Sequence, residues 1–496
     1  MFGTSGNVGC IAPVAVFVTV APFQRLMSAP AASTNSSLTP RSPLREVWTI
    51  AWPTVLTMTS YTTMQFADKI MVAQVSPLQL TAQSNGGIWA FNALAMAMGV
   101  MTVINTFVSQ NLGAGRPERG AAYAWAGFWL SAIVWIAVMI PWALALPWLF
   151  AKMPGHSVEL QKLETGYGQI LLFGAVILLC SRAINQYFFG MHRPKVVTLA
   201  AILGNITNVV GNYILIYGSA GVTIGWRGES VHLPGVTIPG LDPLPSLGVY
   251  GAAIATVTGT AVELLIPVCV FLGPKMNREF STRSQWRLNF KPVLELLKLG
   301  WPAAIQWGSE IICWSIFMSV LVGTFGETHM AAGWIALGYM HLSFMPAVGF
   351  SVAVTSLVGK YIGAGQPDVA ANRAHLGLRV AVGYMTVCGL LFFVLRHHLV
   401  AFFVGHDVPA AEMAEIVRIG GWLMICGGVF QTFDAFGIVY SGALRGAGDT
   451  IWPGVMTIIY SWVFIVLGGW LLVTYAPGLE SIGPWIAASV YIILFG

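Results

Sequence analysis

The chain has 496 residues, of which 56% are hydrophobic and only 9% are charged, with a formal net charge of +5. Soluble domains carry about a quarter charged residues, so a soluble fold of this composition could not cover itself with polar surface. The composition therefore excludes a soluble globular protein and indicates an integral membrane protein. The positive charge needs no nucleic-acid partner, because the basic residues follow a membrane pattern.

The first 44 residues differ from the rest. An apolar run at residues 10–23 is too short to span a bilayer, and no basic residue precedes it as in a signal peptide. A stretch rich in Ser, Pro, Ala and Thr follows, SAPAASTNSSLTPRSP. We expect residues 1–44 to form a flexible cytoplasmic tail.

Long apolar segments fill the remainder. About twenty apolar residues cross the hydrocarbon layer as a helix, which gives eleven full spans: residues 47–74, 87–109, 121–150, 168–190, 196–218, 248–273, 293–322, 331–358, 374–404, 416–442 and 451–474. A twelfth begins near Ser481, and the sequence ends at Gly496 before it is complete. The sequence predicts an all-α polytopic membrane protein of 12 transmembrane helices, the last of them either truncated or short.

Basic residues set the orientation. The tail and the even-numbered loops hold 15 Lys and Arg residues, whereas the odd-numbered loops hold 4. Because cytoplasmic loops are the basic ones, the N-terminus is predicted to be cytoplasmic. We expect a multi-pass protein of the cell (inner) membrane.

The chain repeats itself. TIAWP at 49–53 is matched by KLGWP at 298–302, and VSQNLGAGRPERGA at 108–121 is matched by VGKYIGAGQPDVAA at 358–371. The near-constant offset predicts two homologous six-helix lobes, residues 45–273 and 293–496, joined by a basic cytoplasmic linker at 274–292. An even number of spans gives both lobes the same orientation, so an axis along the membrane normal relates them.

Four acidic residues fall inside the spans: Asp68, Glu263, Glu310 and Asp434. Carboxylates in a membrane are costly and commonly bind cations or relay protons. Low dielectric favours the neutral form of a carboxyl group, so a nearby cation can decide whether a proton stays bound. The alternative is a protonated carboxyl that joins two helices. For Glu263 the two readings are balanced, because nothing else marks it.

The fifth span contains GNITNVVGNY, which places Asn205, Asn208 and Asn212 three and four residues apart, on one helix face. Amide oxygens suit a carboxyl group or Na⁺, but Asn also joins helices in membranes. Near Glu310, Gln306 and Trp307 are secondary candidates, and Trp307 could stack on aromatic substrates or simply pack.

Other chemistry is not indicated. The six cysteines form no CxxC pair, so neither disulfides nor a cysteine metal site is expected. The repeated GAGRPE and GAGQPD lack the Lys-Ser/Thr of a P-loop and are expected to form tight turns after helices. No nucleophile–base pair or metal cluster lies in the spans, and we expect neither an enzyme nor a cofactor.

Several motifs together resemble the multidrug and toxic compound extrusion (MATE) transporters, NorM-type branch. They are MQFADKIMVA, VSQNLGAG, NVVGNYILIYG, GVYGAAIAT and YSGALRGAGDT, and the resemblance covers residues 45–496. It implies two lobes that open alternately to each side. It also implies export of cationic amphiphilic compounds in exchange for H⁺ or Na⁺. We separately expect the protein to work as a monomer.

The resemblance assigns the N-lobe acid to Asp68, with Asn208, Asn212 and Thr256 around it, and a possible Na⁺ at the first three. Lys69, beside Asp68, differs from the uncharged residue common in the family. It is expected to face elsewhere, because consecutive helix residues point about 100° apart.

Glu310 and Asp434 are the C-lobe acids that the resemblance implies. Some sodium-coupled relatives have a tyrosine one turn before the second of these acids, where this chain has Phe430, which tilts the expectation toward protons. A lipid-linked oligosaccharide flippase of related fold is the alternative function. An anionic substrate would need a basic cavity, and Arg182 is the clearest base inside the spans.

Overall fold

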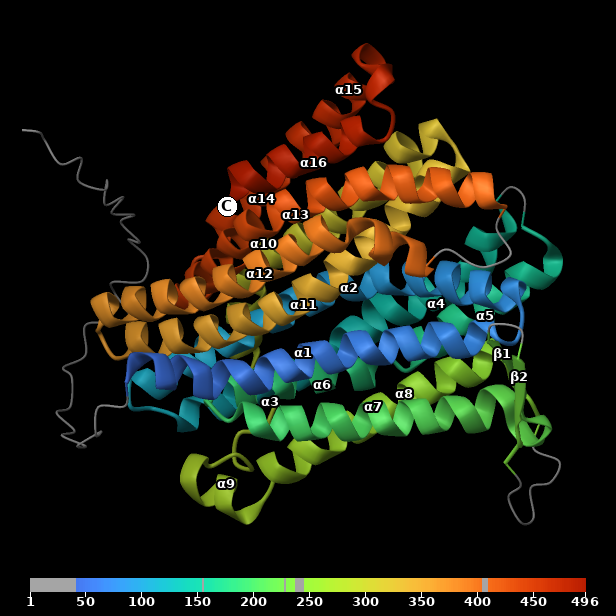
Figure 1. Ribbon diagram of the computed structural model, residues 1–496. Helices are drawn as coiled ribbons and strands as arrows, with labels where there is room; N and C mark the ends of the chain where they lie inside the picture. The colour runs from blue at the N-terminus through green and yellow to red at the C-terminus, as the bar shows by residue number, and fades with distance from the viewer. Residues whose placement is uncertain (1–41, 154–155, 227–228, 237–244, 404–408) are drawn as a thin grey trace, which may run out of the picture. The chain divides into compact units, whose positions relative to one another are not determined.

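The computed structural model describes residues 42–153, 156–226, 229–236, 245–403 and 409–496 (Figure 1). Most of the expected tail lies outside these ranges, and the first helix begins at Pro43. The first half contains α1 (Pro43–Ala73), α2 (Pro77–Gly113), α3 (Glu118–Val134), α4 (Ile140–Ala151), α5 (Val158–Phe173), α6 (Ala175–Gly190), α7 (Pro194–Tyr217) and α8 (Val249–Phe271). The second half follows a short helix α9 (Pro274–Phe280) and contains α10 (Phe290–Ile316), α11 (Glu327–Gly363), α12 (Pro367–Phe403), α13 (Ala410–Ala447), α14 (Ile451–Tyr460), α15 (Gly469–Tyr475) and α16 (Ile482–Phe495).

Among the described residues, nine continuous helices are long and apolar enough to cross a membrane, and one bent pair makes ten. Segments of π-helix join α3 to α4 and α14 to α15 into continuous spans, while α5 and α6 form one span bent by 44°. The 31-residue α1 and the shorter apolar helix α16 complete the twelve spans that the sequence predicts. Each predicted span matches a helix, and most helices extend several residues beyond the predicted ends. The prediction of a 12-helix membrane protein is confirmed.

Prolines and polar caps start several of the helices. Pro77 begins α2, and the preceding Ser76 accepts a hydrogen bond from the backbone N–H of Gln79. Pro194 and Pro367 are likewise the first residues of α7 and α12. Proline suits the first helical position, because its fixed φ matches the helix and its missing N–H would have no partner there.

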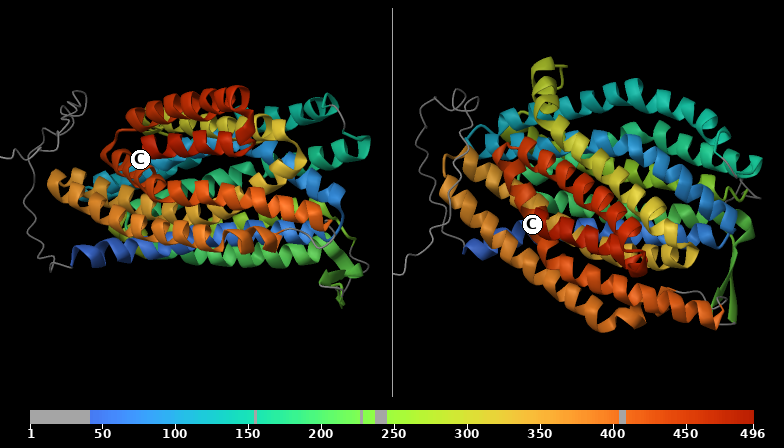
Figure 2. Two further views of the ribbon diagram at one scale, coloured as in Figure 1. Left: turned by 45° about the horizontal axis from the view of Figure 1, so that its top comes forward. Right: turned by 90° about the horizontal axis from the view of Figure 1, so that it is seen from above.

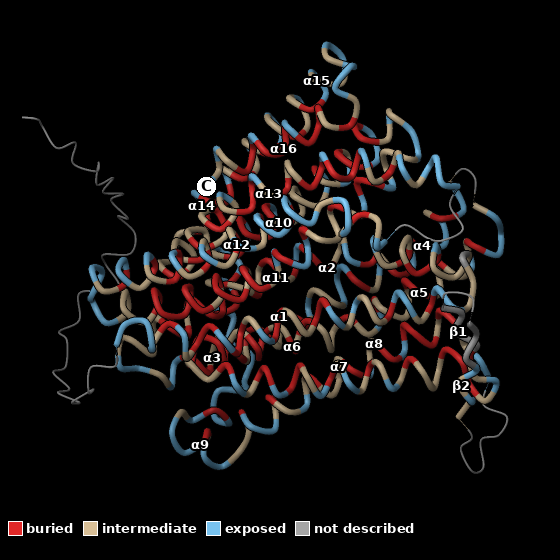
Figure 3. The backbone as a smooth tube through the Cα atoms, in the orientation of Figure 1, coloured by how far each residue is buried: buried red, intermediate tan, exposed pale blue. Residues whose placement is uncertain are grey.

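Large apolar side chains point outward along the spans, as a lipid-facing surface requires. Leu144, Trp148 and Phe402 are exposed by 65%, 63% and 73%. Buried and exposed residues therefore alternate along most helices in Figure 3, although both kinds are apolar. An apolar surface of this extent is unstable in water and stable against acyl chains.

The two halves repeat each other in packing. In the first half α1 packs on α7, and α7 packs on α8; the equivalent pairs in the second half are α10 with α14 and α15 with α16. Between the halves, α1 contacts α11, and α2 contacts both α10 and α11. The views of Figure 2 show these helices running side by side.

One end of this bundle carries the turns at residues 114–117, 191–193 and 364–366 and the linker at 281–289, and we call it the basic end. Several hydrogen bonds join the two halves there. Thr106 Oγ1 donates to the carbonyl of Arg445 at 2.8 Å, Ser356 Oγ donates to that of Phe189 at 2.7 Å, and Gln110 Nε2 donates to that of Gly446 at 3.0 Å. The halves are therefore closely joined at the basic end.

The repeated glycine motifs form the turns that the sequence predicts. Gly115 and Gly365 have φ of +70° and +71°, which residues with a side chain rarely adopt. Each follows a long helix and precedes a proline that leads into the next one.

Two elements were not predicted. Strands β1 (Val222–Trp226) and β2 (Glu229–Leu233) pair antiparallel in the loop after α7, at the end opposite the basic end. The linker expected at 274–292 contains α9, and α10 begins within its last residues.

Candidate functional sites

The first half holds a buried polar group around Asp68. This carboxylate is 7% exposed and accepts a hydrogen bond from Asn212 Nδ2. Asn212 Nδ2 also donates to Asn208 Oδ1 at 3.3 Å, and Asn208 Nδ2 donates to Thr256 Oγ1 at 3.3 Å. Four of the predicted site residues, from α1, α7 and α8, therefore form one connected chain.

Close packing of α7 on α8 makes this chain possible. A Cβ at Gly204 would lie 2.8 Å from the carbonyl of Gly259, and one at Gly259 would lie 2.7 Å from that of Gly204. Only glycine permits this approach, which is typical of membrane helices joined through small residues. The contact brings Asn208 of α7 within reach of Thr256 of α8.

One buried atom in this group has no partner. Within the described ranges, Asn212 Oδ1 is buried without a hydrogen bond. An orphaned amide oxygen beside a carboxylate is a hard-oxygen donor set that fits a proton-bearing group or a small cation such as Na⁺. The residues that could hold the ion are Asp68, Asn212 and Asn208.

Asn205 lies on the same helix but outside this group. Its Nδ2 donates to Ser60 Oγ at 3.0 Å, two turns along α1 from Asp68. Lys69 is exposed while Asp68 is buried, so the two side chains face different surroundings, as the sequence predicts.

Glu263 belongs to a separate buried cluster. It is 5% exposed, and its Oε1 accepts hydrogen bonds from Tyr61, from Asn185 Nδ2 at 2.7 Å and from Ser181 Oγ at 3.2 Å. The guanidinium of Arg182 lies over the ring of Tyr61, 4.5 Å from its centroid. Arg182 and Glu263 are thus opposite charges close to the same tyrosine.

Sequence reasoning did not pair these two charges. Charged side chains inside a membrane usually lie near a charge of opposite sign. Arg182 is the central base and Glu263 the acid without an assigned role, so this rule would have suggested that they lie close together. Arg182 therefore packs inside the first half, over the ring of Tyr61 and within electrostatic range of Glu263.

The second half brings its two predicted acids together. Asp434 of α13 lies within electrostatic range of Glu310 of α10, and both are half-buried. The hydroxyl of Tyr491 on α16 is 3.5 Å from Glu310 Oε1, at the long limit of a hydrogen bond. Tyr491 was not predicted, because its role depends on how α16 packs against α10 and α13.

The secondary candidates near Glu310 lie elsewhere on α10. Gln306 is buried and donates from Nε2 to Thr457 Oγ1 of α14 at 3.0 Å, so it joins two helices. Trp307 is half-buried. Phe430, one turn before Asp434, is 3% exposed and packs in the apolar core of the second half.

The three intramembrane acids have no basic counter-ion in the part of the chain that the structure describes. Among the described residues, none of Asp68, Glu310 and Asp434 forms an ion pair with Lys, Arg or His. Arg445 lies within electrostatic range of Glu310 but does not form a salt bridge with it in this part of the chain. A carboxyl group without a fixed counter-ion can exchange a proton or a cation, whereas a permanently paired one cannot.

Twelve spans in two similar halves, with carboxylates inside each half of the described structure, define a membrane transporter of the two-lobed class. The MatE family model matches residues 53–214 and 309–471, one match in each half, and the chain belongs to this family. The double match agrees with the internal repeat found in the sequence.

The relatives include two proteins of similar length. The chain is 27% identical over 441 residues to the probable multidrug resistance protein NorM of Burkholderia pseudomallei (strain K96243), a match that covers 88% of this chain and 87% of that protein. The same values hold for the protein of that name from Burkholderia mallei (strain ATCC 23344). The resemblance to NorM-type MATE transporters is confirmed.

Solved structures share the fold. The chain resembles an outward-facing multidrug resistance MATE family transporter of the MOP superfamily with a TM-score of 0.79 and 21% identity, over 91% of this chain and 93% of that one. A MOP superfamily transporter from Pyrococcus furiosus, described as having a binding pocket of reverse polarity, gives a TM-score of 0.78 at 21% identity with the same coverage.

Proposed function

We propose that this multidrug transporter is a secondary active antiporter that exports cationic amphiphilic compounds in exchange for H⁺ or Na⁺ by alternating access. The observation that carries the proposal is the set of three intramembrane carboxylates, Asp68, Glu310 and Asp434, without a fixed counter-ion in the described structure. Each can hold either a proton or a cation, and this competition is the minimum device for exchange.

The two lobes supply different ion chemistry. Asp68 has an amide neighbour, whereas Asp434 lies within electrostatic range of Glu310, which has the hydroxyl of Tyr491 nearby. Two carboxylates within electrostatic range repel each other when both are ionised, so each favours a proton or cation on the other. The driving force is adequate, since 100 mV supplies about 2.3 kcal/mol per charge moved.

The orientation is part of the proposal. Because the basic loops gather at one end of the bundle, we place that end in the cytoplasm and the protein in the inner membrane. The halves are joined there, which corresponds to a state closed toward the cytoplasm. A flippase of anionic lipid-linked sugars is less well supported, because Arg182, the central base, packs beside Glu263 and Tyr61.

The test uses proteoliposomes loaded with a fluorescent cationic dye. Dye flux is followed while either a proton gradient or a sodium gradient is imposed alone. Flux driven by protons only assigns the three acids as proton carriers. Flux driven by sodium only assigns Asp68, Asn208 and Asn212 as an oxygen cage. If neither gradient moves the dye, the proposed antiport is wrong.

A further inference from the structure

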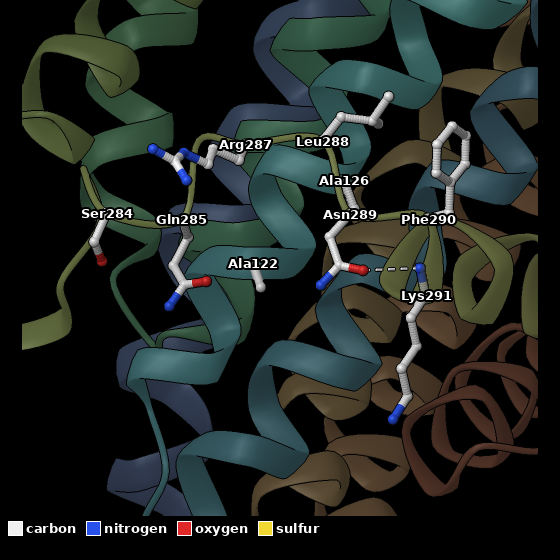
Figure 4. A pocket seen from close by; sticks show the side chains of 9 residues that line it. All are labelled: Ala122, Ala126, Ser284, Gln285, Arg287, Leu288, Asn289, Phe290 and Lys291. Atoms are coloured by element: carbon white, nitrogen blue, oxygen red, sulfur yellow. Dashed lines mark hydrogen bonds between the residues drawn. The ribbon is translucent and has the colours of Figure 1, made fainter.

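A cavity of about 590 Å³ lies at the basic end, between α3 and the segment that joins α9 to α10 (Figure 4). Ala122 and Ala126 of α3 line it from one side, one turn apart, and their small side chains leave the space open. Ser284, Gln285 and residues 287–291 line it from the other side. The cavity is outside both ion sites described above.

The linker wall is held in place by two indoles of α3. Trp125 Nε1 donates to the carbonyl of Thr282 at 2.7 Å, and Trp129 Nε1 donates to that of Trp286 at 3.0 Å. Asn289 Oδ1 accepts from the backbone N–H of Lys291 at 3.0 Å and starts α10 (dashed line in Figure 4). Two bonds to α3, at Thr282 and Trp286, and the helix cap at Asn289 thus fix the segment that lines the cavity.

The cavity is basic, and its charges are available. Arg287 and Lys291 line it, and in the described parts of the chain neither side chain has a hydrogen bond or an ion pair. The nearest acid along α10 is Glu295, whose Oε2 already accepts the hydroxyl of Tyr123 at 2.6 Å. Gln285 adds an amide donor on the side where Ala122 lies in Figure 4.

Apolar side chains alternate with these polar ones. Trp286, Leu288 and Phe290 are exposed by 55%, 40% and 69%. Three large apolar residues within five positions are unfavourable in water but stable at a membrane interface, where aromatic residues collect. The segment therefore combines anion-binding groups with groups that prefer the acyl-chain boundary.

The position of the cavity along the membrane normal also fits a lipid headgroup. The continuous helix Glu118–Ala151 has 34 residues, a length of about 51 Å against a hydrocarbon layer of about 30 Å, so about 10 Å at each end reaches into the headgroup layers. Ala122 and Ala126 lie about 6 and 12 Å from its first residue. With the helix centred in the bilayer, the cavity therefore lies at the boundary between the headgroup and hydrocarbon layers.

We propose that this cavity binds the headgroup of an anionic phospholipid, with Arg287 and Lys291 on the phosphate and Trp286, Leu288 and Phe290 at the acyl-chain boundary. In the orientation proposed above, the lipid belongs to the cytoplasmic leaflet, where anionic lipids attract basic segments. The site itself depends neither on that orientation nor on the antiport. A bound lipid would fasten the linker, which joins the two moving halves.

The test is lipid binding to the full chain in an uncharged detergent. Native mass spectrometry gives the dissociation constants of phosphatidylglycerol and of phosphatidylcholine with the same acyl chains. The double variant Arg287→Gln/Lys291→Gln should weaken phosphatidylglycerol binding by about five-fold or more, the effect of about one basic residue near an anionic membrane. Phosphatidylcholine binding should not change.

The matched control is Lys275→Gln/Arg278→Gln, which removes the same charge from two exposed residues of α9 outside the cavity. An equal loss in both double variants would mean unspecific attraction and would overturn the proposal. Displacement of the lipid by millimolar inorganic phosphate would also overturn it, because the ligand would then be a free anion. As a second variant, Ala122→Phe should fill the cavity and weaken phosphatidylglycerol binding with all charges present.

Discussion

Gly113 of α2 and Gly363 of α11 make the same contact in opposite directions. A Cβ at Gly113 would lie 1.8 Å from the carbonyl oxygen of Lys360, and one at Gly363 would lie 2.0 Å from that of Gln110. Each glycine touches the carbonyl three residues before the other glycine. The two repeated motifs therefore pack on each other and join the halves at the basic end.

Alanine at either glycine should push the halves apart at this end. Overpacking of a close contact costs about 1–3 kcal/mol, and the cost falls only on the state in which the helices touch. Spin labels at Glu118 and Asp368, both exposed at the basic end, should report longer distances in Gly113→Ala and Gly363→Ala. The labels are placed in a cysteine-free background.

Gly338 provides the matched control for this prediction. It lies in the same α11, and a Cβ there would meet nothing within 4 Å. Gly338→Ala should leave the distances unchanged and slightly favour the helix, since alanine is the better helix former by about 1 kcal/mol. Unchanged distances in Gly113→Ala and Gly363→Ala as well would show that the contact does not hold the halves together.

An ion cluster at Glu46 closes the same end. Arg373 Nε and Tyr361 Oη donate to the Glu46 carboxylate at 2.8 and 2.7 Å, and Lys360 Nζ lies at 3.4 Å. Glu46 comes from α1 and its partners from the second half. Glu46→Gln should destabilise the state in which the halves are joined at the basic end by about 2 kcal/mol, the scale of a charged hydrogen bond. A cysteine at the buried position 356 of the same end should then react faster with a thiol reagent. Glu415→Gln is the control, because its partner Arg418 is on the same exposed helix surface.

This closure should not respond to pH near neutrality. Burial raises the pKa of Glu46, but the hydrogen bonds from Tyr361 and Arg373 outweigh it and hold the pKa below the usual 4.5. A group with a lowered pKa stabilises the paired state above its unpaired pKa, and this contribution is lost as the pH falls through the lowered value. The Glu46→Gln effect should thus be equal at pH 6 and pH 8. A difference between these values would assign a pH-sensing role to the cluster.

Variants of two asparagines of α7, Asn212 and Asn205, can distinguish a role in ion binding from a role in helix packing. Asn212 contacts Asp68, whereas Asn205 contacts Ser60. Asn212→Ala should lower ion-driven dye efflux by at least ten-fold, as Asp68→Asn should, because the charge or its main hydrogen-bond partner is removed. Asn205→Ala is the matched control. It removes the same kind of amide away from Asp68, so this variant should keep most of the wild-type efflux rate. Equal losses at the two asparagines would indicate a packing role for both.

Particular residues show what the sequence could predict. The spans follow from apolar length, and the turns at Gly115 and Gly365 follow from glycine and proline spacing. Asp68 could be grouped with Asn208 and Asn212 through the family resemblance. In contrast, the contacts of Tyr491 with Glu310 and of Arg182 with Tyr61 join helices far apart in the chain, and no local pattern sets which helices meet.

The hydroxyl of Tyr491 should tune the ion site of the second half rather than create it. Tyr491→Phe removes the group 3.5 Å from Glu310 but leaves both carboxylates. We expect efflux to continue with a changed dependence on the coupling ion, whereas Glu310→Gln and Asp434→Asn should abolish efflux in correctly inserted protein. Efflux assays over a range of pH and sodium concentration compare the three variants. Wild-type efflux in either acid variant would remove that acid from the mechanism.

Glu263 should prove to be structural. Its carboxylate accepts three hydrogen bonds and lies near the charge of Arg182. Glu263→Gln leaves a buried guanidinium without its counter-charge, which costs about 3–5 kcal/mol, so the thermal midpoint should fall. Arg182→Gln/Glu263→Gln removes both charges and should recover much of that stability, together with efflux. If the double variant is stable but transports nothing, Glu263 or Arg182 acts in transport itself, since stability alone would then not explain the loss.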